Sequence, residues 1–200
     1  MKIGILDYGG GNISNIKKAF NIIEVPTVVI EKKKDINKYE KIILPGMGSA
    51  PHAMKIIKQN KFDISIKDFA KNQNPIMGIC LGFQLMLSKY EISKDSKFNC
   101  LSIVKGSVKK INSENLKLPL IDWHKIESKN SKNYLKNKMF YFAHQYYCDL
   151  DKNDTNATYI KINQNKIVAS YVKKNLHLYQ FHPELSGDSG LIVLNKFKDL

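Results

Sequence analysis

Arginine is absent from the 200-residue sequence, so all 32 of its basic residues are lysine. Against 18 acidic residues they give a formal net charge of +14, and such a charge suggests phosphate binding and a nucleic-acid partner. Arginine, however, supplies the planar fork that binds phosphate and guanine through paired hydrogen bonds. Its absence argues against a nucleic-acid partner and favours a solvated, lysine-rich surface.

Cysteine is scarce and long apolar runs are missing. Cys80, Cys100 and Cys148 lie far apart in the sequence, without the Cys-x-x-Cys spacing of zinc sites and at too low a density for a secreted disulfide scaffold. No apolar run approaches the roughly 20 residues of a membrane helix, and the N-terminus lacks the apolar core of a signal peptide. The histidines form no His-Glu-x-x-His pattern. We therefore expect a cytoplasmic protein that has no metal site and does not bind a membrane.

Short apolar segments alternate with helical patterns in the first 80 residues. This alternation predicts an α/β fold with a mostly parallel central sheet and helices on both faces. We expect strands at 2–6, 27–30, 41–44 and 75–79, and helices at 13–23 and 51–70.

The second half of the chain has a different pattern. Residues 98–171 contain short β-prone pieces separated by polar turns, which predict extra antiparallel strands. A strand at 176–181, a loop and a final helix at 190–198 complete the chain. No linker interrupts the sequence, and its length suits one buried core, so we interpret 1–200 as a single domain.

Cys80 lies in the segment PIMGICLGFQLML, where an apolar strand meets an apolar helix. Gly78 and Gly82 flank it, and glycine relieves crowding in the sharp turn that projects a nucleophile from a sheet edge. The positive end of the following helix would favour a thiolate. A buried structural cysteine is the alternative interpretation of this segment alone.

His182 and Glu184 follow a C-terminal strand in YQFHPE, at the position where open α/β sheets form their binding sites. The imidazole of His182 could accept the thiol proton of Cys80 and later donate it to a leaving group, while Glu184 orients the ring. A surface turn would explain the tripeptide alone, but both motifs in one α/β chain favour a catalytic triad.

A third motif, LPGMGSAP, follows the strand expected at 41–44. The turn formed by Gly46, Met47 and Gly48 could expose backbone N–H groups that, with the N–H of Leu81, form an oxyanion hole. A plain tight turn is the alternative. The GGGN segment near Gly9 lacks the G-x-G-x-x-G pattern of dinucleotide sites.

Together, DYGGGN, LPGMGSAPHAM, GICLGFQLML, HQYY and QFHPELSGDSG resemble the class I glutamine amidotransferases, in particular the glutaminase subunits of imidazole glycerol phosphate synthase. The resemblance covers nearly the whole chain and implies a flavodoxin-like fold. It also implies a triad of Cys80, His182 and Glu184 that forms a glutamyl thioester from L-glutamine. It further implies substrate contact by Gln84, no cofactor, and a heterodimer with a cyclase-type synthase subunit that receives the ammonia.

The resemblance assigns the partner interface and ammonia gate to Asn12, Trp123, His144, Tyr146 and Leu185. The sequence departs from the group's pattern near these positions, with only the tryptophan kept in residues 121–124, Gln145 after His144, and Leu185 in place of a usual lysine. An ammonia supplier for the amidation of a nucleotide-activated or surface-polysaccharide sugar therefore stays an alternative. Two further alternatives are a silent docking subunit and a thiol peptidase of the same superfamily.

Overall fold

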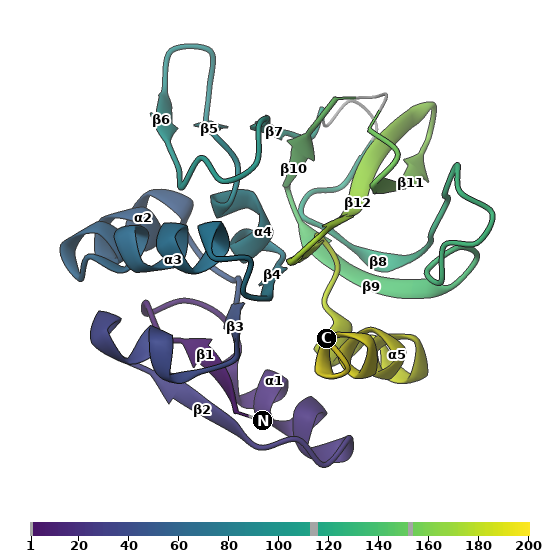
Figure 1. The fold of residues 1–200 in the computed structure, drawn as a ribbon. Helices are drawn as coiled ribbons and strands as arrows, with labels where there is room; N and C mark the ends of the chain where they lie inside the picture. The colour runs from purple at the N-terminus through teal and green to yellow at the C-terminus, as the bar shows by residue number, and fades with distance from the viewer. Residues whose placement is uncertain (1, 113–115, 152–153) are drawn as a thin grey trace.

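The computed structural model describes residues 2–112, 116–151 and 154–200. A seven-stranded sheet crosses the molecule in the order β11-β12-β13-β4-β3-β1-β2 (Figure 1). The five strands from β13 to β2 are parallel, whereas β11 and β12 pair antiparallel. The α/β class with a mostly parallel central sheet is thus confirmed. The strands are β1 (Ile3–Leu6), β2 (Thr27–Ile30), β3 (Lys41–Leu44), β4 (Ile76–Ile79), β11 (Ala157–Ile162), β12 (Asn165–Lys173) and β13 (Leu176–Tyr179).

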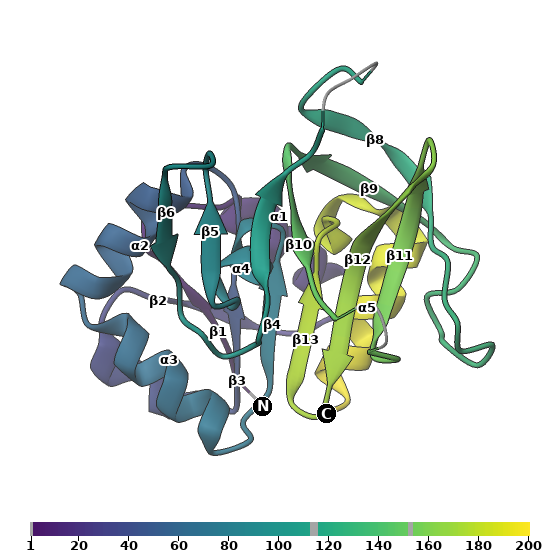
Figure 2. The same cartoon turned by 90° about the horizontal axis from the view of Figure 1, so that it is seen from above.

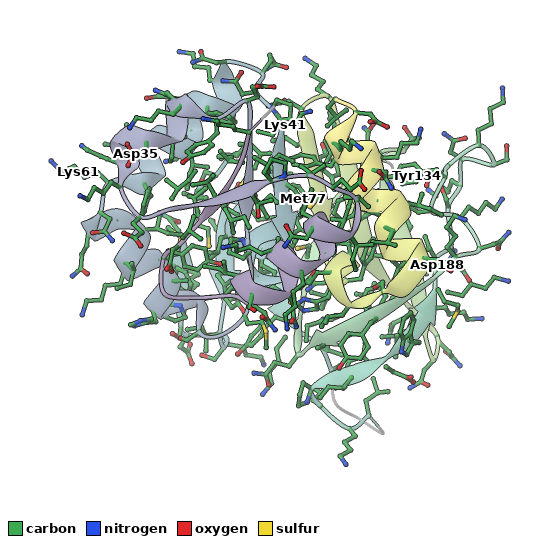
Figure 3. The ribbon with its side chains drawn as sticks, turned by 90° about the horizontal axis from the view of Figure 1, so that it is seen from below. Asp35, Lys41, Lys61, Met77, Tyr134 and Asp188 are labelled. Atoms are coloured by element: carbon green, nitrogen blue, oxygen red, sulfur yellow. The ribbon has the colours of Figure 1, made fainter. Side chains whose placement is uncertain are left out.

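Helices cover both faces of this sheet (Figures 1 and 2). One apolar cluster joins Ile5 and Met77 of the sheet to α1 and α5, and the other joins Leu44 to α2 and α3. Met77 lies in the interior, whereas Lys61 projects from the edge (Figure 3). The helices are α1 (Ile13–Ile22), α2 (Ala50–Gln59), α3 (Phe62–Lys71), α4 (Leu81–Leu85), α5 (Gly187–Lys198) and the 3₁₀ turns η1 (Lys33–Lys38) and η2 (Pro183–Leu185).

Two smaller sheets account for the β-prone segments of the second half. One has the order β10-β7-β5-β6, and the other is the antiparallel pair β8-β9. The four-stranded sheet packs on the apolar cluster that contains Leu44, and the β8-β9 pair packs on the cluster that contains Met77. This packing supports the single-domain interpretation, which stays a prediction. Their strands are β5 (Lys89–Glu91), β6 (Lys97–Asn99), β7 (Ser107–Lys110), β8 (Leu120–Lys125), β9 (Met139–His144) and β10 (Tyr146–Asp149).

Two sequence-based predictions of helices were wrong. The helix expected at 51–70 is two helices, α2 and α3, because Lys61 adopts a left-handed backbone with φ +56° and breaks the hydrogen-bond ladder. The last helix begins at Gly187, before the expected Gly190. Gly190 therefore lies inside α5, and a Cβ there would lie 1.9 Å from the carbonyl oxygen of Pro183, so only glycine fits at this contact.

None of the helices in the described part of the chain has the length and apolar character needed to span a lipid bilayer.

Candidate active site

Cys80 occupies the sharp turn between β4 and α4. Its backbone has φ +48° and ψ −107°, a conformation that costs energy for any residue with a Cβ and is characteristic of strained functional turns. The turn is held by hydrogen bonds from the Cys80 N–H to the Tyr179 carbonyl at 2.7 Å and from the Gln84 N–H to the Cys80 carbonyl at 3.1 Å. The expected elbow is therefore present. The helix after it spans only five residues, so its dipole favours a thiolate less than we expected.

Glycines bring the turn at 45–48 into backbone contact with the elbow. A Cβ on Gly46 would lie 2.1 Å from the Ile79 carbonyl oxygen and 2.4 Å from the Leu81 nitrogen. A Cβ on Gly82 would lie 2.1 Å from the Leu44 carbonyl oxygen. No side chain can occupy either position without moving backbone. The close approach places the Gly46–Gly48 turn beside Leu81, as an oxyanion hole shared between them requires.

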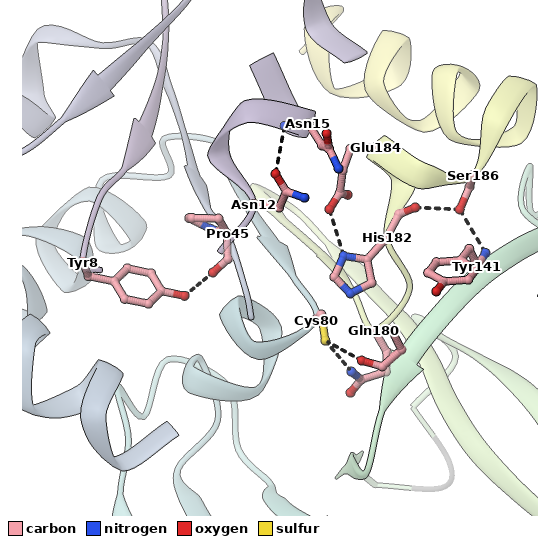
Figure 4. Close-up of polar contacts among 11 residues, drawn as sticks. Tyr8, Asn12, Asn15, Pro45, Cys80, Tyr141, Gln180, His182, Glu184 and Ser186 are labelled. Atoms are coloured by element: carbon pink, nitrogen blue, oxygen red, sulfur yellow. Dashed lines mark hydrogen bonds and ion pairs between the residues drawn. The ribbon is translucent and has the colours of Figure 1, made fainter. Parts of the chain in front are cut away.

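His182 lies between Cys80 and Glu184 (Figure 4). Its Nδ1 donates to Glu184 Oε1 at 2.8 Å, and both side chains are only 2% exposed. Its Nε2 is buried and has no hydrogen-bond partner among the described residues. Burial lowers the pKa of His182, but the neighbouring Cys80 and Glu184 outweigh burial and raise that pKa to about 10. These interactions favour a positively charged imidazole at neutral pH.

The backbone around His182 is fixed from β9 and η2. The His182 N–H donates to the Tyr141 carbonyl at 2.9 Å, and the Ser186 hydroxyl donates to the His182 carbonyl at 2.6 Å. The same hydroxyl oxygen accepts the Tyr141 N–H at 3.0 Å (Figure 4). These bonds fix the His182 backbone, and the bond to Glu184 in η2 fixes its ring, so the imidazole has little freedom to leave the sulfur.

The raised pKa of His182 predicts a pH-dependent contribution to stability. Because its folded-state pKa lies near 10 and its ordinary value is 6.5, protonated His182 stabilises the fold fully below about pH 6.5 and loses this effect as pH rises through about 10. Urea unfolding of the protein and of His182→Asn should be measured at about pH 6, 8 and 9.5. The difference in free energy of unfolding should shrink as pH rises; a constant difference would contradict the charged imidazole.

A cavity of about 390 Å³ opens beside Cys80. All five residues predicted for the oxyanion hole or substrate contact line it, together with the predicted interface residues His144 and Tyr146. None of the described lining residues is a lysine, aspartate or glutamate. The five are Gly46, Met47, Gly48, Leu81 and Gln84.

His144 is buried in the cavity wall and not exposed at a surface. Its Nδ1 lies 2.8 Å from the Tyr146 carbonyl oxygen, which can only accept, so Nδ1 carries the proton. Burial lowers the pKa of His144 to about 4, so the ring is neutral near pH 7. The structure thus groups His144 and Tyr146 with the substrate cavity, and their assignment to a partner interface stays a prediction.

The other three residues assigned to the interface lie outside this cavity. Asn12 caps α1, with its Oδ1 accepting the Asn15 N–H at 3.1 Å. Trp123 on β8 is 44% exposed, and Leu185 in η2 is 37% exposed. Both apolar side chains are available to a partner, but the interface assignment stays a prediction.

Two groups near the sulfur were not predicted from the sequence. The Gln180 side-chain Nε2 donates to Cys80 Sγ at 3.6 Å (Figure 4), and the Cys80 thiol contacts the Ala143 carbonyl oxygen at 3.9 Å. Gln180 stands two residues before His182, a spacing that in a strand places both side chains on one side and that could have indicated it. Tyr8 was not predicted either; its hydroxyl donates to the Pro45 carbonyl and joins the DYGGGN loop to the turn at 45–48.

No three His, Cys, Asp or Glu side chains gather in a metal-binding arrangement within residues 2–112, 116–151 and 154–200. A nucleophilic sulfur, a proton carrier and nearby backbone N–H groups suit acyl transfer through a thioester.

Known proteins are similar to this chain in sequence and in fold. The model of the family described as glutamine amidotransferase class-I matches residues 4–198. A Chlorobaculum tepidum protein named imidazole glycerol phosphate synthase subunit HisH is 34% identical over 199 residues, covering 98% of each chain. A protein of the same name from Prochlorococcus marinus subsp. pastoris is 33% identical over 201 residues, covering 98% of this chain and 97% of its own.

Solved structures show the same fold at lower identity. A crystal structure described as a glutamine amidotransferase aligns with a TM-score of 0.76 at 15% identity, covering 98% of this chain and 97% of the other. A structure of PurLQS from Thermotoga maritima aligns with a TM-score of 0.74 at 19% identity, covering 99% and 97%. The family match and the relatives span almost the full chain, so this protein belongs to the class I glutamine amidotransferases, glutamine-hydrolysing enzymes that use a catalytic cysteine.

Proposed function

We propose that this chain is the glutaminase subunit of an imidazole glycerol phosphate synthase and supplies ammonia to a cyclase subunit in histidine biosynthesis. The observation that carries the proposal is the buried His182–Glu184 pair beside Cys80, which itself lines an uncharged cavity. The names of the relatives give the same assignment for nearly the full length of the chain. A cytoplasmic location and a heterodimer are part of the proposal.

The proposed reaction has two halves that share the same groups. Cys80 Sγ attacks the side-chain carboxamide carbon of glutamine, and His182 Nε2 donates its proton to the nitrogen as the C–N bond breaks. Ammonia leaves and a glutamyl thioester remains on the sulfur. A water molecule then gives a proton to His182 and attacks the thioester carbon, which releases glutamate and the sulfur. Glu184 accepts the Nδ1–H of His182 throughout and keeps Nε2 directed to the reaction.

Backbone N–H groups would stabilise the negative oxygen of each tetrahedral intermediate. We assign this role to Met47 and Leu81, which line the cavity on either side of the Gly46 contact. Gly48 has φ +104°, a conformation that glycine adopts readily and that lets this turn redirect its N–H groups. We also assign substrate contact to Gln84, which lines the same cavity and is 3% exposed.

The uncharged cavity suits a small amide such as glutamine and does not suit a phosphorylated nucleotide. The described residues that line it include no lysine, and His144 is neutral there. A phosphorylated substrate would therefore bind the cyclase subunit, while this chain binds L-glutamine. The proposed chemistry uses only protein groups and water, and it needs no cofactor.

Two other functions have less support. Sugar amidation would use the same glutaminase chemistry with another partner, but the relatives are named for imidazole glycerol phosphate synthase. A silent docking subunit would have no need for a His182–Glu184 pair held at 2.8 Å beside a strained cysteine.

Glutamate release from glutamine tests the function. We expect the cyclase and its nucleotide substrate to complete the oxyanion hole. Release by the chain alone should then be slow and should increase about 100-fold with this partner, because one oxyanion-hole donor contributes about that factor. Full turnover by the chain alone would contradict completion of the oxyanion hole by the partner. Stimulation only by a different synthase would favour sugar amidation, and no release in any mixture would favour the silent subunit.

A further inference from the structure

The side-chain amide of Gln180 lies against the sulfur of Cys80 and is fully buried (Figure 4). Residues 180–182 directly follow β13, and their side chains lie on alternating sides. Tyr179 and Phe181 contact each other on the core side, with ring centroids 5.1 Å apart. Gln180 and His182 extend to the opposite side, so one strand end delivers two groups to one sulfur.

Neighbouring groups fix which end of this amide faces the sulfur. The Tyr146 carbonyl oxygen can only accept, so the Gln84 amide directs its Nε2 there, at 3.0 Å. The same Nε2 donates to Gln180 Oε1 at 3.1 Å, and the Tyr90 hydroxyl donates to Gln84 Oε1 at 3.3 Å. Because Gln180 Oε1 is occupied by this donor, its Nε2 faces Cys80 Sγ. The three hydrogen bonds from Tyr90 through Gln84 and Gln180 to the sulfur are therefore all donated toward Cys80.

We infer that Gln180 is a positioning residue for the Cys80 thiolate, and that Gln84 and Tyr90 hold Gln180 in the donating orientation. The inference rests on the proposed function only in taking Cys80 as the nucleophile. A buried anion is costly without hydrogen bonds, and an N–H that donates to a charged acceptor stabilises it more than a neutral contact does. Gln180 thereby favours the thiolate and restrains its direction of attack.

Gln180 and His182 both act on the Cys80 sulfur, but only His182 changes its protonation state. His182 gains and loses a proton during turnover, so its attraction for the sulfur changes between steps. A carboxamide does neither, and its N–H stays directed at the sulfur whenever the thiolate leaves or returns. Gln180 thus provides a constant donor beside a variable one.

The test is the pH dependence of Cys80 alkylation by iodoacetamide, followed by mass spectrometry of the labelled peptide. Cys100 and Cys148 react slowly in this assay because burial raises the pKa of Cys100 to about 12 and that of Cys148 well above its usual range. In Gln180→Met, which keeps the length and removes the donor, Cys80 alkylation near neutral pH should slow about tenfold, because the thiolate loses a buried hydrogen bond. With glutamine, kcat should fall while KM changes little.

Three further variants separate positioning from a general structural role. Gln180→Glu places a carboxylate near the sulfur and should slow Cys80 alkylation further, because like charges repel. Gln84→Met frees Gln180 to turn and should slow the alkylation less, which tests the inference even if Gln180→Met does not fold. Thr158→Val is the matched control, since it removes a buried hydroxyl contact of 2.6 Å to Ser170 outside the site and should leave the alkylation profile unchanged.

An unchanged pH profile in a folded Gln180→Met or Gln84→Met variant would overturn the inference, as would an equal shift in Thr158→Val. These results do not depend on glutamine hydrolysis. Retained glutaminase activity in Cys80→Ala would instead overturn the proposed function, so the two failures are distinguishable.

Discussion

Replacing Cys80 by alanine is expected to reduce glutamine hydrolysis by at least about 10⁴-fold, because Cys80 is the only thiol among the described residues that line the cavity. The substitution removes one buried sulfur from a side chain that is 6% exposed. It should therefore cost only about 1 kcal/mol of folding free energy. The measurement is glutamate release with the cyclase subunit and its nucleotide present, where the parent enzyme is most active.

Cys100→Ala is the matched control for this experiment. Cys100 is also buried, at 5% exposed, but it lies in the apolar cluster under α2 and α3, away from the triad. This variant should keep nearly all of the activity at a similar cost in stability. Equal losses in both variants would mean that the decrease reflects damage to the fold, and activity in Cys80→Ala would remove the cysteine from the mechanism.

Replacing Gly46 by alanine is expected to destabilise the protein by about 3 kcal/mol or more and to abolish activity. The new Cβ would lie 2.1 Å from the Ile79 carbonyl oxygen and 2.4 Å from the Gly82 nitrogen, so backbone must move on one side of the contact. That movement separates the turn at 45–48 from the elbow and disrupts the proposed oxyanion hole. Urea unfolding and glutamate release would measure the two effects.

Ser49→Ala is the matched control three residues away. Ser49 precedes α2 without a side-chain capping bond and is exposed, so its loss should change the free energy of unfolding by less than about 0.5 kcal/mol. A similarly small effect of Gly46→Ala would contradict the close packing of the turn against the elbow.

Local pattern was enough to predict the first half of the sheet. The strands β1 to β4 and the helix α1 agree with the expectations to within one residue or two, because short apolar runs and helical spacing depend on near neighbours in the sequence. The pattern failed where a single backbone angle or a tertiary contact decided the outcome. The positive φ of Lys61 separates α2 from α3. Gly190 lies inside α5, where its close contact with the Pro183 carbonyl leaves no room for a side chain.

The same distinction between local sequence pattern and tertiary contact applies to the active site. Cys80, His182 and Glu184 could be proposed from the sequence because the first follows one apolar strand and the other two follow another, each in a recognisable string. The sequence alone thus determined the α/β class and the proposed triad, which stays a prediction.

Only the tertiary structure decided which groups surround the sulfur. Gln180 and Gln84 are 96 positions apart in the sequence, yet their amides meet at 3.1 Å and the first of them reaches Cys80. His144 likewise became a neutral cavity residue through burial. Hydrogen-bond direction and burial depend on strands that pair across the whole chain, and no local pattern carries that information.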